Sequence, residues 1–304
     1  MTTTLEFRAM VADIPRAHEL RPAILPRAVQ FGLIGLVVAL AILAWMITGD
    51  RMQGMDAGPG TELGDLGWFA GVWVVMTAAM MFPSILPVVV THARTRAGDG
   101  ERRAAVVSLG TALFIGGYLL AWAAGLLGYA LFDALRSLEI GFLAWDEAGR
   151  YVAAGVLLGA ALYQLTPLKD ACLTECRHPL AFHRHSCRPG SVGALTTGIA
   201  HGAWCVGCCW ALMAALFALG VMSIGWMALI AGLIATEKLL PWKAVGKRGV
   251  MAVLLALAIA VAVAPDDVPG LTLPNSPEAG QPMEAMGMDH GGESGAAMER
   301  RPAR

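Results

Sequence analysis

The stretch "PGSVGALTTGIAHGAWCVGCCWALMAALFALGVMSIGWMALIAGLIAT", residues 189–236, decides the class of fold. It runs for 48 residues without a Lys, Arg, Asp or Glu. A transmembrane helix needs about 20 consecutive apolar residues to cross a hydrocarbon core of about 30 Å, so this interval can hold two helices. The segment "GVMSIG", residues 220–225, supplies a natural break between them. The sequence therefore predicts two membrane spans here.

Five further charge-free intervals can each hold one apolar helix of about 20 residues. The composition, 57% hydrophobic with a mean hydropathy of +0.61, lies outside the range of soluble globular proteins. We therefore expect an all-α, polytopic membrane bundle of about seven helices, or of six if the short fourth segment is re-entrant. The five intervals are Arg27–Asp50, Asp65–Arg94, Arg103–Asp133, Arg150–Lys169 and Arg248–Asp266.

Lys and Arg residues alternate between rich and poor connecting segments, as the positive-inside rule requires for seven spans with the N-terminus inside and the C-terminus outside. The polar arm before the first span is too long for the n-region of a cleavable signal peptide, so we expect an uncleaved anchor. The expected parts are a cytoplasmic arm (1–27), a helical bundle (28–264) and a disordered periplasmic tail (265–304). The expected location is the inner membrane of a bacterium.

One imidazole and three thiols interrupt the long apolar interval, in "HGAWCVGCCWALM", residues 201–213. At about 100° per residue they share one helical stripe roughly 100° wide, and Cys205 lies near the predicted midplane. Imidazole and thiolate suit Cu(I), Zn(II) or iron, and an ionisable group in a membrane is a functional candidate by default. A single cysteine is more often a small packing residue, but four such groups together favour ligation or redox chemistry. They are His201, Cys205, Cys208 and Cys209.

A second cluster of soft donors lies in "WVVMTAAMMFPSILP", residues 73–87. Neutral thioethers favour Cu(I) over Zn(II), although methionine also fills irregular cores without binding anything. Pro83 and Pro87 each remove a backbone N–H and predict a kink, and broken helices at the midplane are where transporters build ion sites. The candidate ligands are Met76, Met80 and Met81.

Two more clusters lie outside the predicted spans. The cytoplasmic loop expected after span four, residues 163–187, is dense in Cys and His, which favours a metal or redox role, although it has no CxxC pair and thus no zinc-finger spacing. Its alternative interpretation is a solvated basic loop with reduced thiols. Thioethers and imidazole in the tail suit copper capture in an oxidising compartment, or belong to a plain low-complexity linker. The candidates are Cys172, Cys176, His178, His183, His185 and Cys187 in the first, and Met283, Met286, Met288 and His290 in the second.

Five segments occur in the order "MTAAMMFP", "YQLTPLKDACLTECR", "HGAWCVGCCWALM", "GVMSIGWM" and "EK". Through them, residues 66–245 resemble a bacterial family of predicted metal-binding integral membrane proteins, some of whose members are thought to supply copper to a copper enzyme. The resemblance implies metal binding at Met76, Met80, Met81, Cys172, Cys176, His201, Cys205, Cys208, Cys209 and Glu237. From position alone, Glu237 has a second expected role, which is to pair with its neighbour Lys238.

The leading hypothesis is a Cu(I) transporter or copper-delivery protein, with zinc and iron as alternative metals. Its expected partners are the metal ion, the lipid bilayer and a periplasmic copper enzyme or metallochaperone. A net charge of −1 gives no reason to invoke nucleic acid, and the absence of a G-x-x-x-x-G-K-[ST] motif excludes an ATP-driven pump made of this chain alone. A transmembrane thiol–disulfide electron carrier and a scaffold subunit of a membrane complex are the alternatives.

Overall fold

The computed structural model describes residues 26–53, 56, 58–59, 64–96, 103–137, 148–186 and 188–273. This part of the chain is built from helices and contains no strand, which confirms the predicted all-α class. The helices are α2 (Arg27–Met52), α3 (Leu66–Arg96), α4 (Arg103–Trp122), α5 (Gly125–Ser137), α6 (Arg150–Tyr163), α7 (Pro167–Arg177), α8 (Pro179–Ser186), α9 (Gly190–Leu219), α10 (Ile224–Leu239), α11 (Lys243–Val263) and the 3₁₀ turn η3 (Pro265–Asp267).

Five segments of the described chain are long and apolar enough to cross a membrane. Four are the single helices α2, α3, α9 and α11, and the fifth, Ser108–Leu131, runs from α4 into α5. Helices α6 and α7 meet at a bend of 67° and provide a sixth span if the pair crosses as one. Helix α10 has only 16 residues. The chain is thus a polytopic membrane bundle, but the predicted count of seven is not confirmed, and its orientation remains a prediction.

The break expected inside the long apolar interval is present. Helix α9 ends at Leu219, and α10 begins at Ile224. Gly220 adopts a φ of 112°, a backbone conformation that side chains other than glycine rarely tolerate. The glycine therefore allows the chain to turn back, so that α10 packs against α9.

The segment expected to be a loop, residues 163–187, instead contains α7 and α8. Helix α7 begins with the cap typical of helix starts: Thr166 accepts a hydrogen bond from the Lys169 N–H, and Pro167 occupies the first helical position. Helix α7 packs against α9 and α10, while α8 packs against α3 and α9. The Cys- and His-containing segment is therefore part of the bundle.

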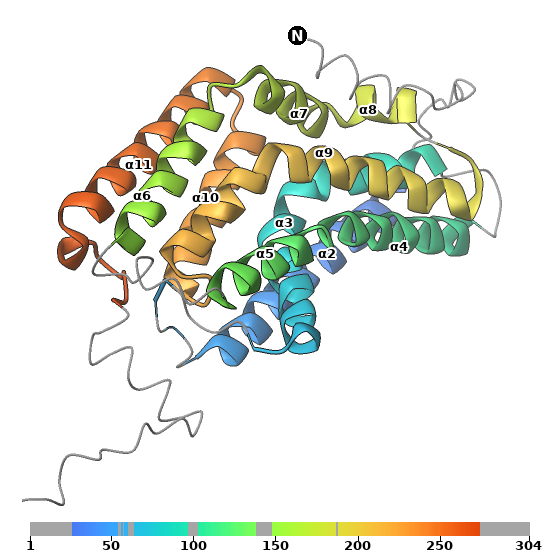
Figure 1. Cartoon of the computed structure of the whole chain (residues 1–304). Helices are drawn as coiled ribbons and strands as arrows, with labels where there is room; N and C mark the ends of the chain where they lie inside the picture. Colours follow the sequence, from blue (N-terminus) through green and yellow to red (C-terminus); the bar gives the residue numbers. More distant parts are fainter. Residues whose placement is uncertain are drawn as a thin grey trace, which may run out of the picture.

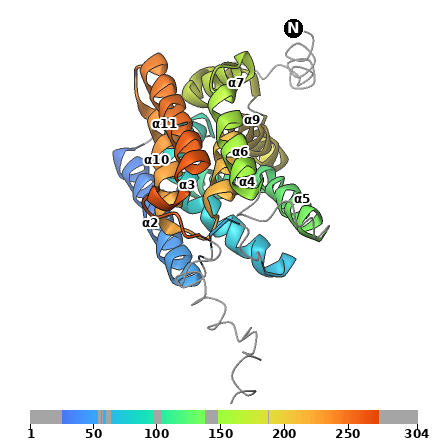
Figure 2. The same cartoon turned by 60° about the vertical axis from the view of Figure 1, so that its left-hand side comes forward.

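Helix α9 occupies the centre of the arrangement (Figure 1). It contacts α4 along much of its length and also packs against α6, α7 and α10. Helix α3 packs against α2, α4 and α10, and α11 lies beside α6, as both views show (Figures 1 and 2). Because α10 touches both α3 and α9, a side chain of α10 can connect these two helices.

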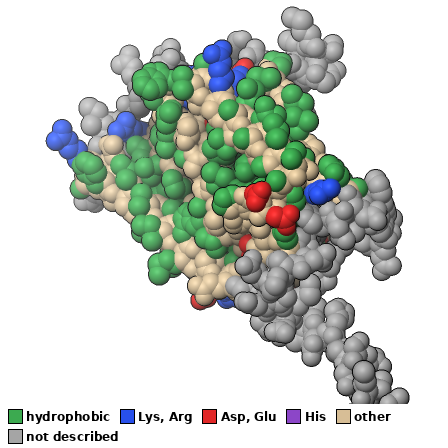
Figure 3. All heavy atoms as spheres, turned by 90° about the vertical axis from the view of Figure 1, so that its left-hand side faces the viewer, with side chains coloured by type: hydrophobic (Ala, Val, Ile, Leu, Met, Phe, Trp, Pro, Cys, Tyr) green, Lys and Arg blue, Asp and Glu red, His purple; other side chains and the backbone are tan. Residues whose placement is uncertain are grey.

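The face formed by α11 and α6 is dominated by hydrophobic side chains, with Lys and Arg side chains near its upper edge (Figure 3). Large apolar side chains are exposed there, which suits contact with lipid tails rather than water. They include Val253, Leu255, Ile259 and Val263 of α11 and Val152, Leu158 and Leu162 of α6.

Helices α4 and α9 approach each other closely through glycines. A Cβ atom added to Gly198 would lie 2.0 Å from the Phe114 carbonyl oxygen, and one added to Gly117 would lie 2.2 Å from the Leu195 carbonyl oxygen. Both obstacles are backbone atoms, which cannot rotate away. Small residues permit such contacts between membrane helices, and here they fix α9 against α4 next to the cysteine-containing turns.

We predict that Gly198→Ala destabilises the bundle by about 1–3 kcal/mol, since the added methyl must push α4 and α9 apart. The measurement is the thermal unfolding midpoint of the detergent-solubilised chain. Gly232→Ala in α10 is the matched control, because a Cβ there meets nothing within 4 Å. Equal midpoints for the two variants would contradict the close approach.

Candidate metal centre

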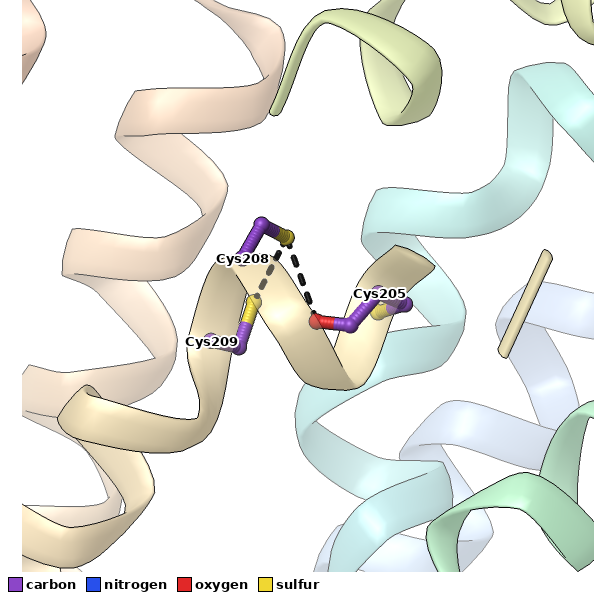
Figure 4. A group of neighbouring side chains, drawn as sticks. All are labelled: Cys205, Cys208 and Cys209. Carbon is purple, nitrogen blue, oxygen red and sulfur yellow. Dashed lines mark hydrogen bonds between the residues drawn. The ribbon is translucent and has the colours of Figure 1, made fainter. Parts of the chain in front are cut away.

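Three cysteines of α9 lie together in the core (Figure 4). Their Sγ atoms all lie within 4.8 Å of one another, and each residue is at most 1% exposed. The Cys208 and Cys209 sulfurs are 3.2 Å apart, and the Cys208 thiol donates to the Cys205 carbonyl oxygen at 3.2 Å. Positions i, i+3 and i+4 share one helix face, which explains why the sequence spacing brings these thiols together.

A fourth thiol comes from α7. Cys176 is buried, its sulfur lies 3.7 Å from that of Cys208, and it also interacts with Cys205. We call Cys176, Cys205, Cys208 and Cys209 the thiol cluster. Cys172, one turn earlier on α7, lies against α9 instead, since its sulfur would be 2.7 Å from a Cβ on Gly207. All five of these cysteines are free thiols.

The spacing of the thiol cluster suits a metal ion. With metal–sulfur bonds of about 2.3 Å, three sulfurs around one ion lie about 4.0 Å apart in a trigonal arrangement. The three α9 sulfurs already fall within 4.8 Å of one another, and Cys176 adds a donor from a second helix. Thiolate donors select Cu(I), Zn(II) or iron–sulfur centres over hard cations such as Mg²⁺.

Lys238 of α10 connects the thiol cluster to α3. Its ammonium group lies 2.9 Å from the Cys205 sulfur and 3.4 Å from the Ser84 hydroxyl of α3, and the residue is buried. The Tyr118 hydroxyl of α4 contacts the same sulfur at 3.0 Å. Cys205 is therefore the point at which α3, α4, α9 and α10 meet. A thiolate there would be the counter-charge of the buried lysine.

A buried ion pair lies beside this site. Lys169 of α7 contacts the Glu237 carboxylate at 2.6 Å and donates to the Cys208 carbonyl oxygen at 2.5 Å. Both side chains of the pair are 1% exposed. The expected pairing of Glu237 with Lys238 is thus wrong: neighbouring residues on a helix point about 100° apart, and Lys238 turns towards Cys205. Lys169, expected to lie in a cytoplasmic loop, is buried instead.

His201 is buried near the thiol cluster, but it is not one of the residues whose ligand atoms gather within 4.8 Å. Its ring lies among aromatic rings, with centroids 6.1 Å from Phe114, 6.1 Å from Tyr118 and 5.0 Å from Phe182. Its Nδ1 has no hydrogen-bond partner within the described residues. His201 as a ligand alongside the cysteines remains a prediction.

The methionine candidates are in the core of α3, which continues as one helix through Pro83 and Pro87. Ser84, about one turn beyond Met80 and Met81, donates to the Met81 carbonyl oxygen at 2.8 Å and accepts from Lys238. The α3 turn that carries these methionines is therefore linked to Cys205 through one lysine. Binding of metal by the thioethers remains a prediction for Met76, Met80 and Met81, which are all buried.

The structure places the two predicted ligands His178 and His183 in different environments. His178 is exposed and lies 3.4 Å from Lys243, whereas His183 is buried against His92 of α3. The side chain of His185 and the predicted ligands Cys187, Met283, Met286, Met288 and His290 lie outside the residues that the structure describes.

Sequence analysis missed several polar groups around the centre. Lys169 was interpreted only as a topology signal, and Lys238 as a topology signal and the partner of Glu237, although both carry charge into the core. His92 lies in a charge-free interval and satisfies the rule that selected His201, namely an ionisable residue inside a predicted span. Tyr118 had no signal of its own, because a tyrosine is ordinary in an apolar helix.

The chain was compared with protein families, curated proteins and solved structures. A family model for copper chaperones, the PpoB2 family, matches residues 70–261, which is more than half of the chain. The match runs from α3 to α11 and includes the whole thiol cluster. No match was found among curated proteins or among solved structures. A copper-related role in metal binding fits both the match and the cysteine cluster. By its sequence, the chain belongs to the PpoB2 family of copper chaperones.

Proposed function

We propose that the protein holds one Cu(I) ion at the thiol cluster, within the membrane, and delivers it to a recipient protein. The observation that carries this proposal is the convergence of four free, buried thiols from α7 and α9, in a member of a copper chaperone family. A chaperone must hold its cargo firmly yet release it. An ion shared between two helices can be released when the helices shift. It can also be released when a thiol of the recipient protein replaces one of the cysteine ligands.

The charges around the thiol cluster favour a monovalent ion. Cu(I) bound by two thiolates carries a net charge of −1, which one buried ammonium group neutralises. Lys238 lies 2.9 Å from the Cys205 sulfur and can play that part. The Lys169–Glu237 pair is neutral as a whole and leaves this balance unchanged. Zn(II) and iron remain the alternative cargoes, and Zn(II) would need three thiolates for the same balance.

In this proposal the other soft donors set the direction of delivery. The thioethers of α3 lie on the helix that Lys238 links to Cys205, so they offer weaker ligands to which Cu(I) can pass. The methionines and the histidine of the tail, Met283, Met286, Met288 and His290, would suit exchange outside the membrane. In this proposal the protein supplies a copper enzyme or a metallochaperone at the periplasmic face of the inner membrane.

An electron carrier is favoured by one observation, the 3.7 Å separation of the Cys176 and Cys208 sulfurs. A disulfide needs about 2.05 Å, so a small shift could close it. This function leaves Lys238 and the methionines without a role. Mass-shift alkylation in cells separates the two functions, since a carrier shows an oxidised fraction of this pair, while a copper site shows thiols protected by metal.

We predict that Cys205→Ser combined with Cys208→Ser removes about one Cu(I) per chain, because hydroxyl oxygens are poor ligands for a soft ion. The measurement is copper content by mass spectrometry of the purified chain, loaded with Cu(I) under reducing conditions. Cys172→Ser is the matched control, since it makes the same change on a buried thiol outside the thiol cluster. Equal copper in the double variant and the wild type would exclude the proposed function.

We predict that Lys238→Gln weakens Cu(I) binding by roughly 10- to 100-fold, which corresponds to about 1.4–2.7 kcal/mol of lost charge compensation. A competition titration against a chromogenic Cu(I) chelator measures this loss. The control is Lys247→Gln, which removes a lysine whose ion pair with Asp170 is partly exposed, and its affinity should match the wild type. An unchanged affinity in Lys238→Gln would show that the lysine does not balance the bound ion.

A further inference from the structure

A second group of metal-ligating side chains lies away from the thiol cluster. His92 of α3 and His183 of α8 face each other, with Nδ1 of His92 3.2 Å from Nε2 of His183. The residues are 0% and 3% exposed. Two imidazoles in contact inside a membrane protein are unusual, because each is polar and costly to bury without a purpose.

The hydrogen bonds define the state of His183. Its Nδ1 lies 2.9 Å from the Pro179 carbonyl oxygen, which can only accept, so this nitrogen carries the proton. The lone pair of Nε2 therefore points at His92. A neutral imidazole whose far nitrogen donates to a backbone carbonyl is the arrangement usual for metal-bound histidine.

His92 has a second ring nitrogen, Nε2, on the side away from His183. Since Nε2 of His183 offers a lone pair, Nδ1 of His92 carries the proton between the rings. Its Nε2 then has no partner of standard hydrogen-bond geometry among the described residues, while the Gly110 backbone interacts with the His92 ring. Moving the proton from Nδ1 to Nε2 turns both facing nitrogens into lone pairs. That form of the pair is a two-nitrogen ligand.

The separation of the two nitrogens fits one ion. With metal–nitrogen bonds of about 2.0 Å, atoms 3.2 Å apart subtend about 106° at the metal, which is near the tetrahedral angle. Arg96, one turn after His92 on α3, donates to the carbonyl oxygens of Arg188 and Gly190. A fixed positive charge near the two histidines disfavours a divalent ion more than a monovalent one.

Aromatic side chains connect the histidine pair to the thiol cluster. Phe114 stacks on His92 at 4.5 Å, and Phe182 contacts His183 at 5.4 Å. Both phenylalanines also contact His201, at 6.1 and 5.0 Å. The His201 ring also contacts the ring of Tyr118, whose hydroxyl contacts the Cys205 sulfur. His201, with its unpartnered Nδ1, thus lies between the two groups.

We propose that His92 and His183 form a second Cu(I)-binding site. The ion passes between this site and the thiol cluster by way of His201. The choice of copper rests on the proposed function, whereas the site itself rests on the facing nitrogens and their hydrogen bonds. The histidine site binds Cu(I) more weakly than the thiol cluster does, because imidazole is a less soft ligand than thiolate. An ion is therefore held loosely there and can move on.

The test uses the purified full-length chain titrated with Cu(I) under anaerobic, reducing conditions, followed by X-ray absorption at the copper edge. The wild type is expected to bind two Cu(I) per chain, with both sulfur and nitrogen neighbours. His92→Gln combined with His183→Gln should bind one, with the nitrogen contribution lost and the sulfur contribution kept. Glutamine retains a polar group at each position, and size-exclusion chromatography with circular dichroism verifies the fold. The single variant His183→Asn should lose the same copper. It provides the test if the double variant does not fold.

His178→Gln is the matched control, since it removes an exposed histidine that precedes α8, and it should bind copper as the wild type does. Two Cu(I) per chain and an unchanged spectrum in the folded His92/His183 variants would overturn the second site. Failure of the proposed function would appear elsewhere, as unchanged sulfur-bound copper in the Cys205→Ser/Cys208→Ser variant. The two outcomes are therefore distinguishable.

Discussion

A positive charge buried in a membrane bundle needs a partner, and Lys238 meets this constraint with a sulfur. Its ammonium group contacts Cys205 and Ser84, and no carboxylate contacts it within the described residues. A pairing of ammonium and thiolate lets both groups stay in the core, where either alone would be costly. The same thiolate is the form that binds a soft metal ion. One buried lysine of α10 thus links Ser84 of α3 to Cys205 of α9.

The second buried lysine positions Cys176, the thiol that α7 contributes to the thiol cluster. Lys169 joins α7 to Glu237 of α10 and to the Cys208 carbonyl of α9. Arg177, at the end of α7, donates to the carbonyl oxygens of Glu237 and Leu240. These contacts hold α7 across the bundle, so Cys176 reaches Cys208. Removing one partner of such a pair strands a buried charge at a cost of about 3–5 kcal/mol, which makes the position of α7 specific.

The sequence predicted those features that depend on local spacing. The charge-free intervals located the apolar helices, Gly220 lies at the expected break, and the i, i+3, i+4 spacing put three thiols of α9 on one face. Features that depend on packing between helices were missed or wrong. Nothing in "PLKDACLTECR" distinguishes a soluble loop from a helix that folds back, because Lys169 is charged in either case. The pairing of Glu237 across helices, and the contact of His92 with His183, require the tertiary fold.

The central claim is that thiols from α7 and α9 share one copper ion inside the membrane. An anomalous difference map at the copper edge, from crystals of the Cu(I)-loaded chain, tests it most directly. A shared ion predicts a peak about 2.3 Å from the Cys176 sulfur of α7 and from at least one sulfur among Cys205, Cys208 and Cys209 of α9. A loaded protein with copper density elsewhere, and none at these four sulfurs, would contradict it.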